Sequence, residues 1–430
     1  MKPFRIVVSQ NPAKNALSSV GVPRYTSLVC SIFSSNFAKL WIAIGFGMSS
    51  RSQVVNCGFV MSISAKINPK KSKKMKNEDP HIMKKFWRLP KAVNGKLILV
   101  CGLGSIGKRH IENLISLGIS PSNIIIFRTG KGTVTFGDAF LKREPRIRVI
   151  NSLEKALALK PFITLITNPT ALHLDTATRA AKAGSHLFIE KPLGINLNKA
   201  KNLSRLCRRK QLIACVGYNL RFHPLLRLMK SIIKEGKIGL PVYVEAEHAE
   251  YLPDWHPWEN YRVSYASQDK LGGGSILTQS HEADALYWLF GKPNTIYTAG
   301  GTSDGLPMNV ENIAECILQY KHKKIIAALH LDYFKSPPVR FLEVTGTKGR
   351  LKFDYITGTL SYIPLAGKQH VFHQPKNFFR NDMFLDEIKH LITCAARGVE
   401  PMNNLTEAAE VLEILLAMKR SLSTHKATNL

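Results

Sequence analysis

Short runs of apolar residues alternate with amphipathic segments from Lys96 onward. Runs that are apolar almost throughout are typical of parallel strands buried on both faces. The predicted strands are 97–101, 124–127, 163–167 and 187–189, with a shorter one at 148–150. Helical spacing predicts helices at 106–117, at 153–159 with Ser152 as the cap, and from His173 to a stop at Gly184. This alternation predicts a doubly wound α/β domain with a parallel sheet.

The pattern changes beyond Pro224. Residues 241–251 alternate between apolar and polar side chains, as a half-buried strand does, and later segments continue in this style. These segments are 316–320, 325–331, 340–344 and 350–353, with a hairpin turn at 321–324. Two amphipathic helices follow at 382–395 and 406–422, the second capped by Thr406. The second half is therefore predicted to be an α+β domain with a mainly antiparallel sheet.

The first apolar run leads into a glycine-spaced turn, Gly102-x-Gly104-x-x-Gly107, that opens a helix. Between a strand and a helix, this spacing predicts a dinucleotide-binding turn. The first glycine allows the tight turn, the second lets backbone N–H groups approach a pyrophosphate, and the third lets the helix pack closely on the strand. The N–H groups at the helix start, including those of Ser105 and Ile106, then face the phosphates. The first domain is therefore predicted to be a Rossmann domain over residues 95–216.

The second strand ends at Arg128, which Thr129, Gly130 and Lys131 follow. An acidic residue about 20 positions after the glycines normally binds the ribose hydroxyls of NAD. Arg128 can instead make bidentate bonds to a 2′-phosphate, with Thr129 beside it and Lys131 adding a second charge. We therefore expect NADP(H). The alternative is a solvated arginine beside a cofactor held in another way, so NAD remains possible.

Polar residues follow the next two apolar runs. Asn168-Pro169-Thr170 and His173 come after one, and Glu190-Lys191-Pro192 comes after the other. The carboxyl ends of parallel strands are where open α/β sheets bind ligands. Together with the glycine turn and its His110, and with Gly217-Tyr218-Asn219-x-Arg221-Phe222-His223-Pro224, these motifs resemble the glucose–fructose oxidoreductase/inositol dehydrogenase/rhizopine catabolism (Gfo/Idh/MocA) family. The resemblance covers residues 95 to 425.

The resemblance implies a nicotinamide oxidoreductase that acts on sugars, polyols or their derivatives. It also implies a cis Lys191–Pro192 bond, a Lys191 side chain that reaches the reacting carbon, and a homodimer or homotetramer built on the second sheet. The second domain, 217–425, is expected to bind the substrate. The expected cofactor contacts are Gly102, Gly104, Ser105, Ile106, Gly107, Arg128, Thr129, Asn168, Pro169, Thr170, His173, Glu190 and Lys191.

A glycine triplet at 272–274 precedes a predicted helix that Ser275 caps and that runs to Gly291. His281 and Asp284 lie three residues apart, hence on one helical face, where the carboxylate can orient the imidazole. In the family a histidine at this place serves as acid/base, and the alternative is a buried structural histidine. Thr278 stands where a common family pattern has an aspartate, which leaves His281 and Lys191 as the expected catalytic pair.

The stretch 255–262 is dense in aromatic and hydrogen-bonding residues. Tyr261 can stack on a sugar ring and Arg262 can pair with a carboxylate or phosphate. An equally weighted alternative is a small satellite core under a long loop. The insertion resembles family members of nonulosonic-acid and surface-polysaccharide biosynthesis. The expected substrate contacts are Asn219, Arg221, Tyr261, Arg262 and Asp284.

Residues 1–77 hold 12 Lys or Arg and no acidic residue, so they contribute +12 of the net charge of +30, and the rest of the chain contributes +18. We expect residues 1–90 to be a disordered basic extension, either an organelle transit peptide or, with more weight, an over-extended gene start. The apolar stretch 40–46 is too short to span a bilayer, so no membrane partner is expected. No basic stripe interleaved with aromatics occurs in the body of the chain, so no nucleic-acid partner is expected.

The seven cysteines form no CxxC pair, and no histidine cluster has metal-ligand spacing. This argues against a zinc site or a disulfide framework, so we expect no metal and a reducing, cytoplasmic location. The predicted function is hydride transfer between a nicotinamide and a secondary alcohol or ketone of a sugar or nucleotide-linked sugar. The alternative is a non-catalytic cofactor-binding sensor or regulator, which the missing carboxylate at 278 favours and the presence of Lys191 and His281 disfavours.

A chain that starts at Met83 is expected to fold and to keep full activity, because the motifs all lie beyond it. Circular dichroism and turnover of the truncated and full chains would check this. Loss of folding in the truncated chain would contradict it.

Overall fold

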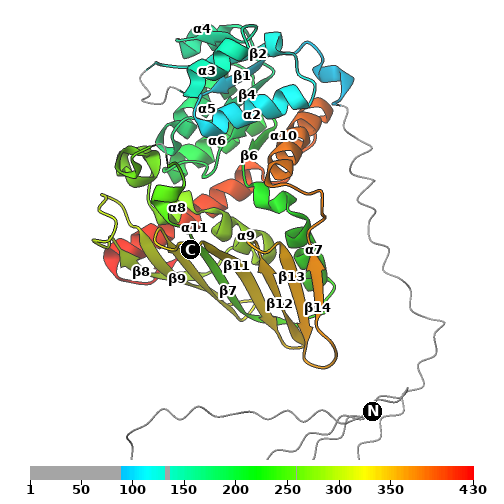
Figure 1. Cartoon of the computed structure of the whole chain (residues 1–430), viewed down its shortest axis with the longest axis vertical. Coiled ribbons are helices and arrows are strands. Elements are labelled where there is room, and N and C mark those ends of the chain that lie inside the picture. Colours follow the sequence, from blue (N-terminus) through cyan, green and yellow to red (C-terminus); the bar gives the residue numbers. More distant parts are fainter. Residues whose placement is uncertain (1–88, 131–135, 258) are drawn as a thin grey trace, which may run out of the picture. The chain divides into compact units, whose positions relative to one another are not determined.

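The computed structural model describes residues 89–130, 136–257 and 259–430 (Figure 1). For residues 136–138 it describes the backbone only. The basic extension expected at 1–90 lies almost wholly outside the described residues, and so does Lys131. Within the described part, no helix is long and apolar enough to cross a membrane. Its five cysteines are all buried and free.

The first half of the described chain contains a parallel sheet. Its strands are β1 (Ile98–Cys101), β2 (Ile124–Phe127), β3 (Arg148–Ile150), β4 (Ile163–Ile166), β5 (His186–Ile189) and β6 (Ala214–Val216). Their order is β3-β2-β1-β4-β5-β6, and every neighbouring pair is parallel. The residues of β1 and β4 are all buried, as their uninterrupted apolar runs predict. The doubly wound sheet expected from the sequence is thus confirmed.

The helices that connect these strands are α2 (Ser105–Ser116), α3 (Phe136–Arg143), α4 (Leu153–Ala158), α5 (His173–Lys182) and α6 (Leu197–Arg209). Ser152 caps α4 as predicted, because its hydroxyl accepts a hydrogen bond from the N–H of Lys155. Short 3₁₀ turns complete this half: η1 (Lys91–Val93), η2 (Pro121–Asn123), η3 (Thr170–Leu172) and η4 (Asn219–Phe222).

A second sheet lies in the remaining part of the chain. Its strands are β7 (Pro241–Ala249), β8 (Thr295–Gly301), β9 (Ile313–Tyr320), β10 (Ile325–Asp332), β11 (Val339–Gly346), β12 (Gly349–Asp354), β13 (Thr359–Pro364), β14 (His370–His373) and β15 (Thr428–Asn429). Their order is β14-β13-β12-β11-β7-β10-β9-β8-β15. The pairs are antiparallel except β7 with β10, which is parallel because β7 inserts between two later strands that run in opposite directions.

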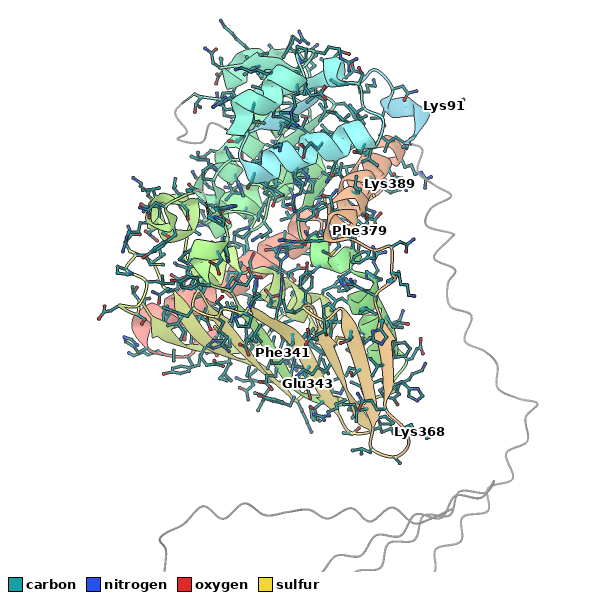
Figure 2. The ribbon with its side chains drawn as sticks, viewed as in Figure 1. Lys91, Phe341, Glu343, Lys368, Phe379 and Lys389 are labelled. Carbon is teal, nitrogen blue, oxygen red and sulfur yellow. The ribbon has the colours of Figure 1, made fainter. Side chains whose placement is uncertain are left out.

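One face of this sheet is packed and the other is open. Along β9 buried and exposed residues alternate strictly, as a half-buried strand requires. On the open face, Phe341 and Glu343 of β11 are labelled in Figure 2. Lys352 of β12 lies 4.5 Å from the centre of the Phe341 ring, and Glu343 pairs with Arg350 at 2.9 Å. Cross-strand pairs of this kind stabilise a solvent-facing sheet surface.

The helices of the second half are α7 (Pro224–Lys234), α8 (Ser275–Thr278), α9 (His281–Phe290), α10 (Arg380–Arg397) and α11 (Leu405–Thr424). Four 3₁₀ turns lie between β7 and α8: η5 (Leu252–Asp254), η6 (Tyr261–Val263), η7 (Tyr265–Ser267) and η8 (Asp269–Leu271).

Two details of the predicted helices are wrong. The helix expected from Ser275 to Gly291 is broken at Gln279 and Ser280, where the Gln279 side chain donates to the Asp332 carbonyl, and Gly274 rather than Ser275 occupies the cap position. The last helix is capped by Asn404, not Thr406, because the Asn404 side chain accepts hydrogen bonds from the N–H groups of Thr406 and Glu407.

Helix α10 returns from the second half of the chain to the first sheet and lies beside α2 (Figure 1). Ile388, Leu391 and Ile392 belong to the same hydrophobic cluster as Val100 of β1 and Ile126 of β2. A helix distant in sequence therefore completes the core under the glycine turn. This packing brings α10 close to the residues that follow β5.

Candidate active site

The glycine turn joins β1 to the start of α2. Gly102 has a φ of +113°, a conformation that favours glycine, and Thr167 at the end of β4 donates to its carbonyl at 3.0 Å. A Cβ on Gly107 would collide with the Gly102 carbonyl, whereas a Cβ on Gly104 would meet no atom within 4 Å. Gly104 is the cap residue of α2 and provides no side chain, so the first-turn N–H groups are left for another acceptor. This open, donor-rich helix start fits a dinucleotide pyrophosphate.

The side chain of His173 connects the two loops that follow β4 and β5. Its Nδ1 lies 2.9 Å from the Pro192 carbonyl oxygen and its Nε2 lies 2.7 Å from the Asn168 carbonyl oxygen. Asn168 in turn donates to Thr176 at 2.9 Å, and Thr170 is buried. The buried His173 therefore holds the loops that follow β4 and β5 together.

Arg128 follows β2 at the same edge of the sheet, with its N–H bonded to the Ile150 carbonyl of β3. Arg128 is half-buried and Thr129 is exposed. Because β1 and β2 are parallel neighbours, the end of β2 lies beside the glycine turn, where Gly102 N–H donates to the Phe127 carbonyl.

Lys191 lies in the turn that follows β5, and its peptide bond to Pro192 is cis, as the resemblance implied. The Lys191 ammonium donates to the carbonyl of Thr278, at the end of α8. Burial lowers the pKa of Lys191 to about 8, against the opposing effect of the neighbouring Glu190 carboxylate. Through this hydrogen bond, Lys191 of the cofactor domain contacts the segment that precedes His281.

His281 is the first residue of α9. Burial, and next the charge of Lys191, hold the pKa of His281 well below its ordinary value, so the imidazole is neutral at neutral pH. Its Nδ1 is buried and has no partner among the described residues, and the Tyr218 ring lies edge-on at 5.9 Å. A neutral imidazole next to an ammonium is an arrangement that can accept a proton and stabilise a developing negative charge.

The expectation that Asp284 orients His281 is wrong. Both Asp284 oxygens bond Arg221, to Nε at 2.9 Å and to Nη2 at 2.6 Å, and Arg221 also pairs with Glu407 of α11. The side chains of Arg221 and Asp284 are each only 1% exposed. The reason is a partner distant in sequence: the Arg221 guanidinium of η4 donates to both carboxylate oxygens of Asp284. Buried and paired with each other, Arg221 and Asp284 hold η4 against α9, which leaves neither side chain exposed to a substrate.

Thr278, at the position where the common family pattern has an aspartate, is buried. Its hydroxyl donates to the Gly274 carbonyl at 2.8 Å and also bonds the Tyr333 hydroxyl. The carboxylate nearest in sequence to His281 is Glu282, which pairs with His248 at 2.8 Å and with Arg340 at 2.6 Å. Sequence reasoning missed this network, although His248 and Arg340 face each other in register on β7 and β11.

The aromatic stretch packs as a satellite core, the alternative to a substrate-contacting loop. Trp255 and Tyr261 pack against a small cluster that contains Leu252 and Tyr333. Arg262 is exposed, with its guanidinium 5.1 Å from the centre of the Tyr261 ring. Asn219 is buried at the start of η4.

The parallel sheet, the glycine turn and the Lys191 turn define a dinucleotide-binding oxidoreductase domain joined to an α+β domain. The chain belongs to the GFO/IDH/MocA oxidoreductase family: the family model for the NAD-binding Rossmann fold matches residues 96–218, and the model for the GFO/IDH/MocA C-terminal domain matches residues 226–352.

Individual relatives are distant. The scyllo-inositol 2-dehydrogenase (NAD(+)) of Bacillus subtilis (strain 168) is 25% identical over 347 residues, which cover 75% of this chain and 92% of that protein. The 2,7-anhydro-N-acetylneuraminate hydratase of Escherichia coli (strain K12) is 25% identical over 222 residues, which cover 50% of this chain and 57% of that protein. The match to the hydratase thus spans little more than half its length.

Solved structures share the fold over nearly their whole length. Levoglucosan dehydrogenase in complex with NADH and levoglucosan superposes with a TM-score of 0.68 at 16% identity, covering 78% of this chain and 99% of that one. The WlbA dehydrogenase from Bordetella pertussis in complex with NADH and UDP-GlcNAcA has a TM-score of 0.66 at 20% identity, with the same coverage.

The glycines of the turn provide a matched pair of substitutions. Gly107→Ala is expected to lower the free energy of unfolding by about 2 kcal/mol or more, because its Cβ overlaps the Gly102 carbonyl. Gly104→Ala is expected to leave stability within about 0.5 kcal/mol and to weaken dinucleotide binding, since its Cβ enters open space at the helix start. Denaturant unfolding and nucleotide titration measure the two effects, and equal stability losses in both variants would contradict this assignment.

Proposed function

We propose that the chain is an NAD(P)-dependent oxidoreductase that transfers a hydride between the nicotinamide and a secondary alcohol or ketone of a sugar or nucleotide-linked sugar. The observation that carries this proposal is the bond from Lys191 to the carbonyl of Thr278, which joins the cofactor domain to the segment before a neutral His281. Relatives named as inositol and levoglucosan dehydrogenases support the substrate class. The non-catalytic alternative is not proposed, because both Lys191 and His281 are present and lie together.

The bound nicotinamide supplies the hydride acceptor for oxidation and the donor for reduction. In oxidation, His281 takes the proton of the substrate hydroxyl, because its imidazole is neutral at neutral pH. Lys191 donates a hydrogen bond to the same oxygen and stabilises its negative charge. With a pKa of about 8, the ammonium is mostly protonated at pH 7 and can also give up its proton in the reductive direction. Asn168 and Pro169 line the cofactor, and Asn219, Tyr261 and Arg262 are the remaining candidates for substrate contacts.

We assign NADP(H) as the preferred cofactor. The support is chemical: a basic residue, Arg128, stands at the end of β2 where an acidic residue would bind the adenosine ribose of NAD. A guanidinium there makes paired hydrogen bonds to a 2′-phosphate.

The proposed assembly is a homodimer or homotetramer in the cytoplasm. The open face of the second sheet exposes Tyr243, Ile317 and Ile326, each between 40% and 47% accessible. Exposed apolar residues gathered on a sheet face favour burial against a second copy. The free, buried cysteines fit a reducing compartment.

Lys191→Met is expected to lower kcat by about 100-fold or more while dinucleotide affinity changes less than threefold, because the proton-handling group is lost and the phosphate turn is untouched. Lys199→Met is the control, since Lys199 is an exposed lysine of α6 paired with Asp175. Steady-state kinetics on a panel of sugars and nucleotide sugars, with nucleotide titration, test this. Unchanged turnover in Lys191→Met would remove Lys191 from the mechanism.

Arg128→Ala is expected to raise the KM for NADPH at least about tenfold and to change the KM for NADH less than threefold, since one charge-assisted bidentate contact is lost. The exposed Arg146 provides the control substitution to alanine. A wild-type kcat/KM that favours NADH over NADPH would refute the assignment of NADP(H).

A further inference from the structure

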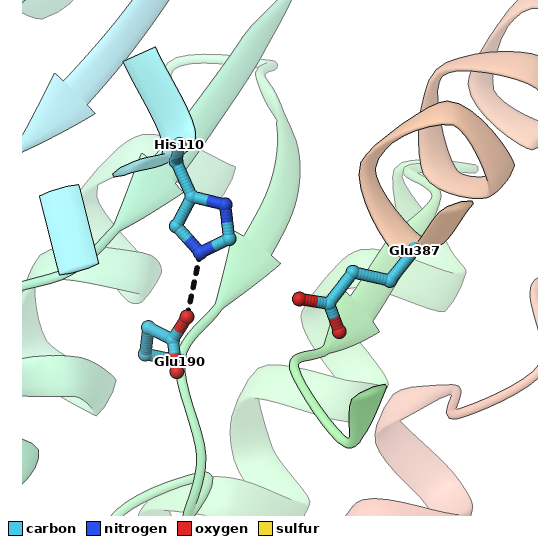
Figure 3. A group of neighbouring side chains, drawn as sticks. All are labelled: His110, Glu190 and Glu387. Carbon is cyan, nitrogen blue, oxygen red and sulfur yellow. Dashed lines mark hydrogen bonds and ion pairs between the residues drawn. The ribbon is translucent and has the colours of Figure 1, made fainter. Parts of the chain in front are cut away.

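A second cluster of ionisable side chains lies behind the Lys191 turn. His110 comes from α2, Glu190 from the end of β5 and Glu387 from α10, and one nitrogen or oxygen of each lies within 4.8 Å of those of the other two. His110 and Glu387 are fully buried and Glu190 is 8% exposed. Figure 3 shows Glu387 reaching from its helix toward the bonded pair of His110 and Glu190. Three elements thus meet at one buried polar point.

The hydrogen bonds in this cluster are unequally distributed. His110 Nε2 lies 2.6 Å from a Glu190 oxygen, while neither oxygen of Glu387 has a partner among the described residues. An ionised carboxylate that is buried without a cation or donor is strongly destabilised, and it takes up a proton instead. Burial and the Glu190 charge accordingly raise the pKa of Glu387 well above its ordinary value.

The histidine also has an atom without a partner within the described ranges. His110 Nδ1 is also buried without a partner in the described part of the chain. The Nε2–H of His110 donates to Glu190, so His110 has no hydrogen bond left for Glu387 among the described residues. Of the two carboxyl groups, Glu190 is the one that carries the negative charge. Burial raises the pKa of Glu190, but the His110 hydrogen bond and the neighbouring Lys191 charge act together against burial, and the pKa is lowered.

We propose that Glu387 is a neutral carboxylic acid that donates a hydrogen bond to the Glu190 carboxylate, and that it is a positioning residue for Lys191. Glu190 is the link, because its second oxygen accepts the backbone N–H of Lys191 at 3.2 Å. Its negative charge also opposes the effect of burial on the ammonium. The inference rests on the proposed function for its catalytic consequence, but the protonation of Glu387 stands independently of it.

Other charged groups face both residues. The Lys191 ammonium is influenced by Glu190, Arg340, Glu282 and Glu250, and it in turn acts on His281. Glu387 faces Glu190 of β5, His110 of α2 and the buried Cys215 thiol of β6. Among the described residues, no lysine or arginine acts on Glu387, so protonation rather than ion pairing neutralises it.

Infrared spectroscopy of the purified full-length protein at neutral pH tests the protonation directly. The difference spectrum of wild type against Glu387→Gln is expected to show the loss of one protonated-carboxyl C=O band. The control is Glu112→Gln, an exposed glutamate of α2, which is expected to remove no such band. Absence of the band in the wild type, or a stoichiometric zinc or manganese ion retained on this histidine and two glutamates, would overturn the proposal.

The positioning role is tested by comparing Glu387→Gln with Glu387→Leu. The amide keeps a neutral donor, so kcat and its pH dependence are expected to stay within threefold of the wild type. The leucine fills the space without a donor, and kcat is expected to fall at least tenfold with dinucleotide KM changed less than threefold. Equal kcat in the two variants, with both folded by circular dichroism, would show that the side chain only fills space.

The two proposals fail separately. If the wild type turns over no sugar or nucleotide sugar while the infrared band is present, the proposed function fails and the protonated Glu387 stands. If turnover is found and the band is absent, the proposed function stands and the inference about Glu387 fails.

Discussion

The hydrogen bond between His110 and Glu190 connects the two places on which the site depends. His110 lies on α2, the helix that begins at the glycine turn, and Glu190 immediately precedes Lys191. A bond of 2.6 Å between buried partners therefore fixes the separation of the phosphate-binding helix start from the turn that carries the ammonium. A bound dinucleotide would span that separation. Loss of the His110–Glu190 bond would therefore disturb the site at both the phosphate end and the nicotinamide end.

Burial sets the chemical character of the groups around that contact. It lowers the pKa of both Lys191 and His281, which keeps one ammonium near its titration point and one imidazole neutral at neutral pH. The buried Arg221 with its two carboxylates behaves differently: as a paired ion cluster it holds η4 to α9 and α11 and stays charged. Buried ionisable groups thus have two roles in this protein. Lys191 and His281, with lowered pKa values, are suited to proton transfer, whereas Arg221, which is paired with two carboxylates, stabilises the fold.

Local patterns in the chain predicted much of this arrangement. The apolar runs, the glycine turn and the alternating segments of the second half correspond to strands and turns of the structure, and the cis Lys191–Pro192 bond implied by the resemblance is present. The predictions that failed, the unbroken helix from Ser275 and the partner of Asp284, depend on contacts with distant strands and turns. Helical spacing indicates which residues share a face, but not which side chains or carbonyls of distant elements reach that face or interrupt the helix.

The sequence by itself therefore determined the sheet type, the glycine turn and the identity of Lys191 and His281, because each follows from short-range periodicity or from a motif within a few residues. Only the tertiary structure decided that Arg221 engages Asp284 and that Thr278 is sealed against Tyr333. It alone brought Glu387 of α10 behind Glu190. These pairings join residues 55 to 197 positions apart, and which of many polar side chains meet in a core is fixed by the packing of whole elements.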